Sequence, residues 1–211
     1  MTSYSPYKNP AIDRVYNLLF CDDLALYREG HSSPEIEPWK TLFDQHPDAD
    51  DLIAIVDSLG EETRTKLLAV NALRSLGSEI ETKRLFGVIV EVGMDEGLDV
   101  VAAYEDGSAR YINYSEKLVV WDTETTESRK LVDALFEASK IVVDKIGPWD
   151  GERREPIDKG NVRMTFLVSN GLYFGEGPFP VLANDPMGGP VIGCAAGIME
   201  FLIKATNAQS A

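Results

Sequence analysis

The spacing of apolar residues changes once along this chain, and that change constrains the fold more than any other feature. Up to about residue 80, apolar residues recur every three or four positions, as in amphipathic helices. Beyond Leu85 they alternate with polar residues or form short runs, as in β-strands. The pattern therefore predicts a helical subdomain over 1–80 and an α+β domain with an antiparallel sheet over 81–211.

The helical segment is expected to contain four helices joined by short links. Asn9 and Pro10 have the composition of an N-cap followed by the first helical residue. Ser58 and Glu61 have the spacing of a capping box, which predicts the start of the fourth helix. The expected helices cover 10–29, 39–45, 48–59 and the stretch that ends near Leu76.

Two dipeptides in the second segment, Asp106-Gly107 and Asn170-Gly171, have the composition of tight hairpin turns. If each turn has two residues, the partners across the two hairpins follow from counting outward. The expected pairs are Tyr104 with Ala109, Ala102 with Tyr111, Thr165 with Glu176 and Phe166 with Gly175.

Helices and further strands are expected around these hairpins. A β-meander of strands at 85–94, 98–105, 108–114 and 117–121 precedes a long amphipathic helix at 126–146. The second hairpin and a loop rich in Pro and Gly follow, and a buried apolar helix at 191–205 ends the chain. Because hairpins join most of the strands, we expect an antiparallel sheet with the helical segment packed on it.

The charge of the chain limits its partners. It carries 35 acidic and 20 basic residues, for a net charge of −15, and the excess is spread over both segments. An acidic surface repels nucleic acid and anionic membrane, so we expect neither as a partner. No apolar run reaches the roughly 18 residues of a membrane-spanning helix, and the N-terminus lacks a signal-peptide pattern. The charge is explained by solubility alone or by a basic partner protein.

Histidine and cysteine are scarce. His31, His46 and Cys21 lie in the first quarter of the chain, and Cys194 lies near its end. This distribution argues against a His/Cys zinc site and a Cys-His catalytic centre, and we expect neither metal nor cofactor. Two distant cysteines form no disulfide framework, which is typical of a cytoplasmic protein with reduced thiols.

A charged loop with an aromatic residue is the first candidate site. It follows the long helix and contains Trp149, Asp150 and Arg153. Loops held by a rigid frame commonly carry function, and Trp and Arg are enriched in binding hot spots. The alternative is a solvated loop whose Trp covers the edge of the core.

Arg163 and Glu176 form the second candidate site. Arg163 stands at the start of a strand, where its planar guanidinium would hold a carboxylate or phosphate. Glu176 or Asp150 would act as a base, although general acid–base chemistry needs a second positioned group. The alternatives are an edge-strand charge that blocks aggregation and a bent hairpin.

Gly188 and Gly189 form the third candidate site. Glycines before a helix can offer backbone N–H groups to an anion. The P-loop lysine and the dinucleotide-binding glycine pattern are both missing here. The alternative is that the glycines and alanines of this stretch allow close packing of the last helix.

Two functions remain open. The leading one is a non-enzymatic protein-binding or regulatory module, similar in composition to acidic immunity proteins and small adaptors. The other is a domain or enzyme that binds an anionic small molecule with carboxylate and Arg side chains. The second hypothesis requires the Trp149 loop, Arg163 and the Gly188-Gly189 loop to converge.

Overall fold

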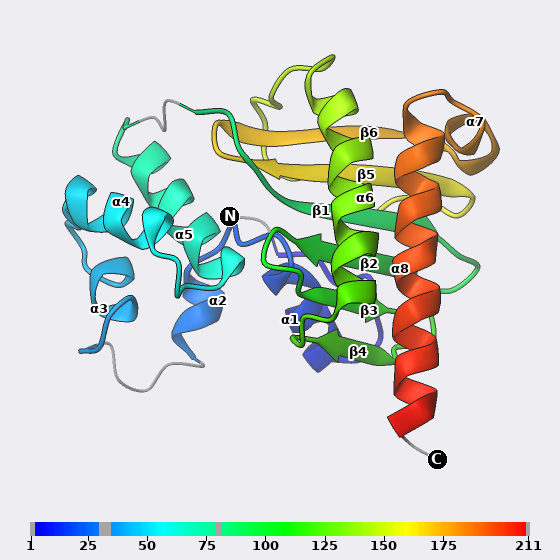
Figure 1. The fold of residues 1–211 in the computed structure, drawn as a ribbon, viewed down its shortest axis with the longest axis horizontal. Coiled ribbons are helices and arrows are strands. Elements are labelled where there is room, and N and C mark those ends of the chain that lie inside the picture. The colour runs from blue at the N-terminus through cyan, green and yellow to red at the C-terminus, as the bar shows by residue number, and fades with distance from the viewer. Residues whose placement is uncertain (1–2, 30–34, 79–81, 210–211) are drawn as a thin grey trace.

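The computed structural model describes residues 3–29, 35–78 and 82–209. Within these residues, eight helices and six strands form three layers, with the sheet between two layers of helices (Figure 1). Helices from the N-terminal segment cover one face of the sheet, and two long C-terminal helices cover the other. Helices followed by an antiparallel sheet and a C-terminal helix confirm the predicted α+β class. The boundary at residue 80 stays a prediction.

The N-terminal layer is built from short helices whose apolar faces meet in one core with the sheet. α1 begins at Pro10, and the Asn9 side chain accepts a hydrogen bond from the N–H of Ala11, as expected for an N-cap. The helices are α1 (Pro10–Leu18), α2 (Ala25–Arg28), α3 (Trp39–Leu42), α4 (Ala49–Asp57) and α5 (Thr63–Ser75).

The single helix predicted over 10–29 is wrong, because the chain turns between α1 and α2. Cys21 has a φ of 53°, which is incompatible with a right-handed helix. The apolar spacing continues across this break because Tyr16 of α1 and Tyr27 of α2 are buried in the same core. The Glu29-Gly30 pair was expected to end that helix, and Gly30 and His31 lie outside the described residues.

The predicted capping box of Ser58 and Glu61 is also wrong. The Ser58 hydroxyl instead accepts a hydrogen bond from the N–H of Gly60. The cap of α5 comes from the first hairpin, where the Asp106 carboxylate accepts from the N–H of Thr63 at 2.7 Å. The Thr63 hydroxyl accepts from the N–H of Asp106 in return. Local spacing cannot reveal a cap supplied from 43 residues away.

The sheet is antiparallel throughout, with strand order β4-β3-β2-β1-β5-β6. The two central strands, β1 and β5, are far apart in the sequence. The 67 residues 94–160 lie between them. The strands are β1 (Leu85–Gly93), β2 (Leu98–Tyr104), β3 (Ala109–Ile112), β4 (Leu118–Trp121), β5 (Asn161–Val168) and β6 (Gly171–Pro178).

Both predicted hairpins form, but the expected registers are wrong. In the first, Ala102 pairs with Arg110 and Ala103 with Ala109, one residue away from the expected pairing. The loop has three residues between Tyr104 and Ser108, because the N–H of Tyr104 bonds to the carbonyl of Ser108. Gly107 ends this loop at a φ of 85°, as is common in three-residue hairpins.

The second hairpin is displaced by two residues from the expected pairing. Gly171 belongs to β6 and pairs with Val168, so the loop consists of Ser169 and Asn170. The expected pair of Phe166 with Gly175 is therefore replaced by Phe166 with Tyr173. The expected pair of Thr165 with Glu176 is replaced in the same way, and Arg163 is the residue opposite Glu176.

Three helices follow the strands: α6 (Thr126–Val143), α7 (Phe179–Ala183) and α8 (Gly188–Gln209). α6 and α8 lie side by side across the sheet (Figure 1). The stretch 179–190, expected to be a loop, contains α7 and the start of α8. Only part of α8 is buried, although the sequence predicted a buried helix.

By length and composition, α8 is apolar enough to cross a membrane. The stretch Gly188–Ala208 has a mean hydropathy of 1.3 in its most apolar window, a third of which is buried. In the structure α8 packs on the sheet through Val191, Ala195, Ile198 and Leu202. The fold is compact. This moderately apolar C-terminal helix belongs to the hydrophobic core between the sheet and the two long helices α6 and α8.

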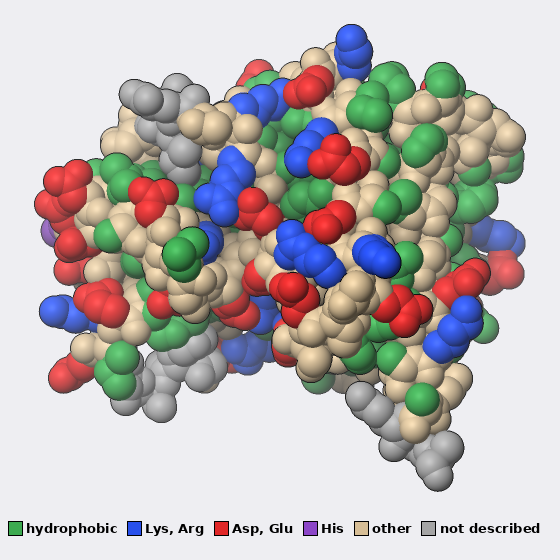
Figure 2. Space-filling model, viewed as in Figure 1, with side chains coloured by type: hydrophobic (Ala, Val, Ile, Leu, Met, Phe, Trp, Pro, Cys, Tyr) green, Lys and Arg blue, Asp and Glu red, His purple; other side chains and the backbone are tan. Residues whose placement is uncertain are grey.

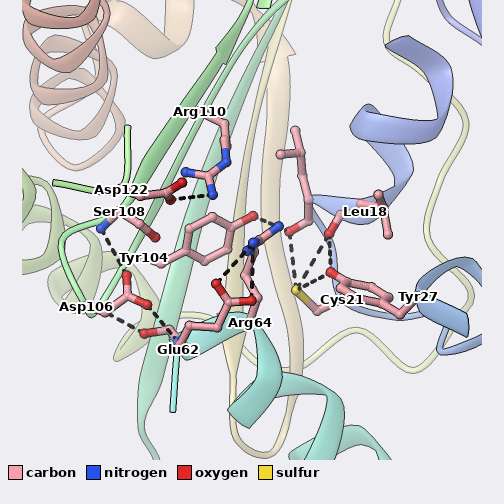
Figure 3. A network of polar contacts seen from close by, with 12 residues as sticks. Leu18, Cys21, Tyr27, Glu62, Arg64, Tyr104, Asp106, Ser108, Arg110 and Asp122 are labelled. Atoms are coloured by element: carbon pink, nitrogen blue, oxygen red, sulfur yellow. Dashed lines mark hydrogen bonds and ion pairs between the residues drawn. The ribbon is translucent and has the colours of Figure 1, made fainter. Parts of the chain in front are cut away.

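Polar contacts tie the N-terminal layer to the sheet near β2 (Figure 3). The Tyr104 hydroxyl donates to the carbonyl of Leu19 at 2.7 Å, and both residues are buried. On the helical side, the Tyr27 hydroxyl lies 3.4 Å from the sulfur of Cys21. Burial raises the pKa of the Cys21 thiol to about 12, so it remains a neutral core residue at physiological pH.

Candidate functional site

A row of three charged side chains crosses the sheet on the face covered by the N-terminal helices. Glu91 of β1, Arg163 of β5 and Glu176 of β6 are direct cross-strand partners. Residues in register on neighbouring strands point to the same face, so the pairing places these charges side by side. Nε of Arg163 lies 2.8 Å from Glu176, and one terminal nitrogen of Arg163 lies 3.5 Å from Glu91.

This charged row is covered by α1 and by the loop that precedes β5. The Tyr16 hydroxyl of α1 donates to Glu91 at 2.7 Å. The other terminal nitrogen of Arg163 donates to the carbonyl of Glu155 at 2.6 Å. The nitrogen near Glu91 also lies 3.5 Å from the carbonyl of Arg154. Glu91 is fully buried, and burial raises the pKa of its carboxyl group despite the attraction of Arg163.

Arg163 therefore has a structural position rather than that of an anion clamp. Its side chain is 5 % exposed, and its guanidinium is surrounded by two carboxylates and two carbonyls. It is also part of an inner strand, so it does not guard a sheet edge. Arg163 contacts Glu176, the other residue of the second candidate site, whereas Asp150 is exposed in the loop.

Arg153 anchors the loop after α6 to the N-terminal layer. Its side chain is 6 % exposed, and its Nε lies 3.1 Å from the carboxylate of Asp22. One terminal nitrogen donates to Asn17 at 2.6 Å, and the guanidinium lies 4.1 Å from the ring centre of Phe20. The loop carbonyl of Arg153 accepts from the Tyr4 hydroxyl. These contacts fix the path of the loop against α1.

Trp149 stays 44 % exposed, but its ring is held in place. The indole N–H donates to the carbonyl of Glu152 at 2.9 Å, and the ring meets Phe174 edge-on at 5.3 Å between centres. A Cβ at Gly151 would lie only 2.7 Å from the indole nitrogen, so the ring packs against the glycine backbone. The backbone N–H of Trp149 donates to the carbonyl of Leu172 on β6.

These residues form one side of a surface hollow of about 370 Å³ that we call the Trp149 hollow. Its other side is the last turn of α5, and its base is the turn after α1. Three segments distant in sequence thus meet at one place. The lining residues are Asp22, Asn71, Arg74, Ser75, Trp149, Gly151, Glu152, Arg153 and Leu172.

Gly188 and Gly189 lie at the start of α8, where an aspartate already occupies the backbone donors. The Asp185 carboxylate accepts from the N–H groups of Met187 and Gly188 at 2.8 and 2.7 Å. These hydrogen bonds lower the pKa of Asp185. A Cβ at Gly189 would lie 2.7 Å from the carbonyl of Ala183, so this glycine allows close packing of α7 against α8.

The expected convergence of all three candidate segments does not occur. Arg163 and Glu176 point to the face covered by α1, together with Glu91. Met164, the next residue along β5, points to the opposite face, and its methyl group lies 3.3 Å from the Cβ position of Gly188. The sheet therefore separates the Gly188-Gly189 turn from the charged row.

A nearly uncharged surface lies on α7 and α8. Asp185 is the only charged residue between Gly177 and Met199, in a chain of which 26 % is charged. Figure 2 shows mainly green and tan atoms over α7 and the upper part of α8. We call this surface the α7–α8 face and define it by its exposed residues: Phe179, Val181, Met187, Pro190, Gly193 and Ala196.

The described residues contain no group of three or more His, Cys, Asp and Glu side chains arranged to hold a metal ion. The acidic residues around His46 serve local turns and caps. The Asp44 carboxylate accepts from the N–H of His46, and the Asp48 carboxylate accepts from that of Asp50 at the start of α4.

Sequence reasoning missed Glu91 and Arg74. A lone acid inside the apolar strand 85–94 was a usable signal for Glu91, since a buried carboxylate needs a partner. Arg74 gave no signal, because nothing in the sequence brings the end of α5 to the Trp149 loop. No protein-family model matches this chain, and no curated protein matches it.

Proposed function

We propose that this protein is a non-enzymatic, cytoplasmic module that binds another protein through its α7–α8 face. The observation that carries the proposal is the near absence of charge on that face in a chain with a net charge of −15. Contiguous exposed apolar surface on a soluble domain is typical of protein–protein interfaces. Two free, distant cysteines, Cys21 and Cys194, support a reducing compartment.

The shape of the α7–α8 face suits a packed contact. Gly193 has open space around its Cβ position, and Ala196 is exposed beside it. Small residues expose the helix backbone and let a partner element approach closely. Val181 is 62 % exposed, and with Phe179 it forms an apolar rim at the α7 end. A contact surface without charged residues at its centre resembles the core of protein interfaces.

The predicted partner is a basic protein with an apolar contact patch. Two copies of this chain carry −15 each and repel one another, which disfavours self-association through this face at low salt. An oppositely charged partner is attracted over a longer range, and its association weakens as salt screens the charges.

The charged row supports a binding role over an enzymatic one. Arg163 and Glu176 are candidate groups for work on an anionic substrate, and Glu91 is the buried acid beside them. Each of them is engaged with another protein group, on a face covered by α1. Their contacts hold the layers together instead of facing a cleft.

The proposal is tested by comparing two single substitutions in affinity capture from the native host. Ala196→Glu places a charge in the centre of the α7–α8 face, and Leu59→Glu places the same charge on a fully exposed residue of the other helical layer. We expect the wild type and Leu59→Glu to retain the same partner and Ala196→Glu to lose it. Recovery of the partner in equal amounts by both variants contradicts the proposal. Failure of the wild type to retain any partner also contradicts it.

A further inference from the structure

We infer that the Trp149 hollow binds a small molecule in which a carboxylate or phosphate is attached to a flat ring. This site is separate from the α7–α8 face and goes beyond the proposed protein-binding function. It combines one available cation, one rigid aromatic wall and a volume of small-molecule size. No single segment of the chain supplies all three, so the fold creates the site.

Arg74 provides the cation. It lies exposed in the last turn of α5, where one terminal nitrogen donates to the side chain of Asn71 at 3.2 Å. Among the described residues, no carboxylate lies within ion-pair distance of Arg74. A guanidinium has five N–H donors in a planar fork, so most of them remain open to a bidentate oxyanion.

The other polar groups beside Arg74 are already engaged and keep it in place. The Asn71 side chain donates to the carbonyl of Cys21 at 2.7 Å. The Ser75 hydroxyl donates to the carbonyl of Asn71. The bond of Asn71 to Cys21 holds the end of α5 against the turn after α1, so Arg74 projects from a fixed support.

Trp149 provides the wall. Its indole is fixed by the carbonyl of Glu152, the ring of Phe174 and the backbone of Gly151, yet 44 % of the residue stays exposed. A preordered aromatic surface loses little entropy when a flat ring stacks on it. The ion pair of the buried Arg153 with the partly exposed Asp22 closes the base of the hollow.

The size of the hollow sets the class of ligand. Its volume of about 370 Å³ is at the lower end of the range for small-molecule sites. One ring with one oxyanion fits such a space. A cation at one side and an indole at the other favour a ligand that has both features.

A larger hollow beside α6 is a weaker candidate for an anion site. It measures about 690 Å³ and contains four basic side chains, each of which is bonded to an acidic side chain or a backbone carbonyl. Arg84 is bound to Glu105 at 2.6 Å, Arg129 to Asp133 at 3.0 Å and Lys140 to Glu137 at 2.8 Å. The fourth, Lys83, donates to the carbonyl of Val143 at the end of α6.

The test is an NMR titration of the whole protein with four probes: benzoate, phenyl phosphate, acetate and inorganic phosphate. The chain has three tryptophans, and the Trp149→Phe variant identifies the indole signal of Trp149. We expect benzoate or phenyl phosphate to shift that signal saturably. The two anions without a ring are expected to bind at least about tenfold more weakly. The tighter of the two ring-bearing probes identifies the oxyanion as carboxylate or phosphate.

Arg74→Gln and Lys140→Gln are matched variants, since each removes one positive charge from an exposed helical position. We expect Arg74→Gln to weaken binding of the ring-bearing probe about tenfold or more, because it removes a charge-assisted pair. Lys140→Gln should bind as the wild type does. The unperturbed spectrum of Arg74→Gln outside the hollow shows that it is folded. Absence of a saturable shift, or equal affinity of Arg74→Gln and the wild type, overturns the inference.

Discussion

Glu91 and Arg163 show how a few buried charges join the two halves of the molecule. The carboxylate of Glu91 belongs to the central strand of the sheet, and its hydroxyl partner, Tyr16, belongs to the helical layer. Arg163 shares its guanidinium between Glu91 and Glu176 and also holds the loop carbonyls. Burying charges is costly unless they are paired and hydrogen-bonded, and every member of this row has such a partner.

Arg163→Ala is expected to destabilise the protein by about 3–5 kcal/mol, because it leaves Glu91 buried without its cation. Arg154→Ala is the matched control. Arg154 also contacts Glu176, at 3.4 Å, but half of its side chain is exposed, so its loss should cost less than about 1 kcal/mol. Urea denaturation of both variants measures the free energies of unfolding. If both variants lost a similar free energy of unfolding, the burial of Arg163 would not explain its contribution to stability.

Glu91→Gln is expected to change how stability depends on pH. Burial raises the pKa of Glu91 in the native state above its ordinary value of 4.5, so the native state holds this proton more tightly than the unfolded chain. As pH rises from that value, the unfolded chain ionises first, and the wild type loses stability until the native carboxyl group also ionises. The free energy of unfolding of Glu91→Gln, relative to the wild type, should therefore increase with pH over this window. Urea titrations at several pH values measure it, and a constant difference contradicts the expected direction.

At the scale of elements, the sequence predicted which segments form strands and helices better than how they pair. The change of apolar spacing near residue 85 and the two turn dipeptides located the strands correctly. The registers failed because a Gly in a turn dipeptide does not determine loop length. Gly107 closes a three-residue loop, whereas Gly171 belongs to the following strand. The two-residue displacement of the second hairpin was enough to hide the pairing of Arg163 with Glu176 across the strands.

The start of α8 offers a direct test of close packing at this scale. Gly189→Ala places a Cβ 2.7 Å from the carbonyl of Ala183, and the strain should cost about 1–3 kcal/mol. Gly193→Ala, four residues later in the same helix, meets open space and should stabilise by about 0.4–1 kcal/mol. Thermal unfolding of the two variants should shift in opposite directions. A shift of the same sign for both would contradict the packing role of Gly189.

At the scale of the whole molecule, function depends on which surfaces the three layers leave open. The sequence identified Trp149 and Arg153 as candidates, and the Trp149 hollow contains both. It did not identify Arg74, because contact between α5 and the loop after α6 arises only when the helical layer packs on the sheet. The same layering separates Gly188 from Arg163, although both stood in one proposed site. The scarcity of charged residues between Gly177 and Met199 can be read from the sequence. Its location on the surface of α7 and α8 comes from the structure.

The most direct measurement of the central claim is site-specific photo-cross-linking in the native host. A photoreactive phenylalanine at Val181 lies on the α7–α8 face, and the same residue at Leu59 lies on an exposed link of the other helical layer. We predict a discrete cross-linked product with a basic protein from position 181, and none from position 59. The same product from both positions, or none from position 181 while the protein is folded, would contradict a binding function of the α7–α8 face.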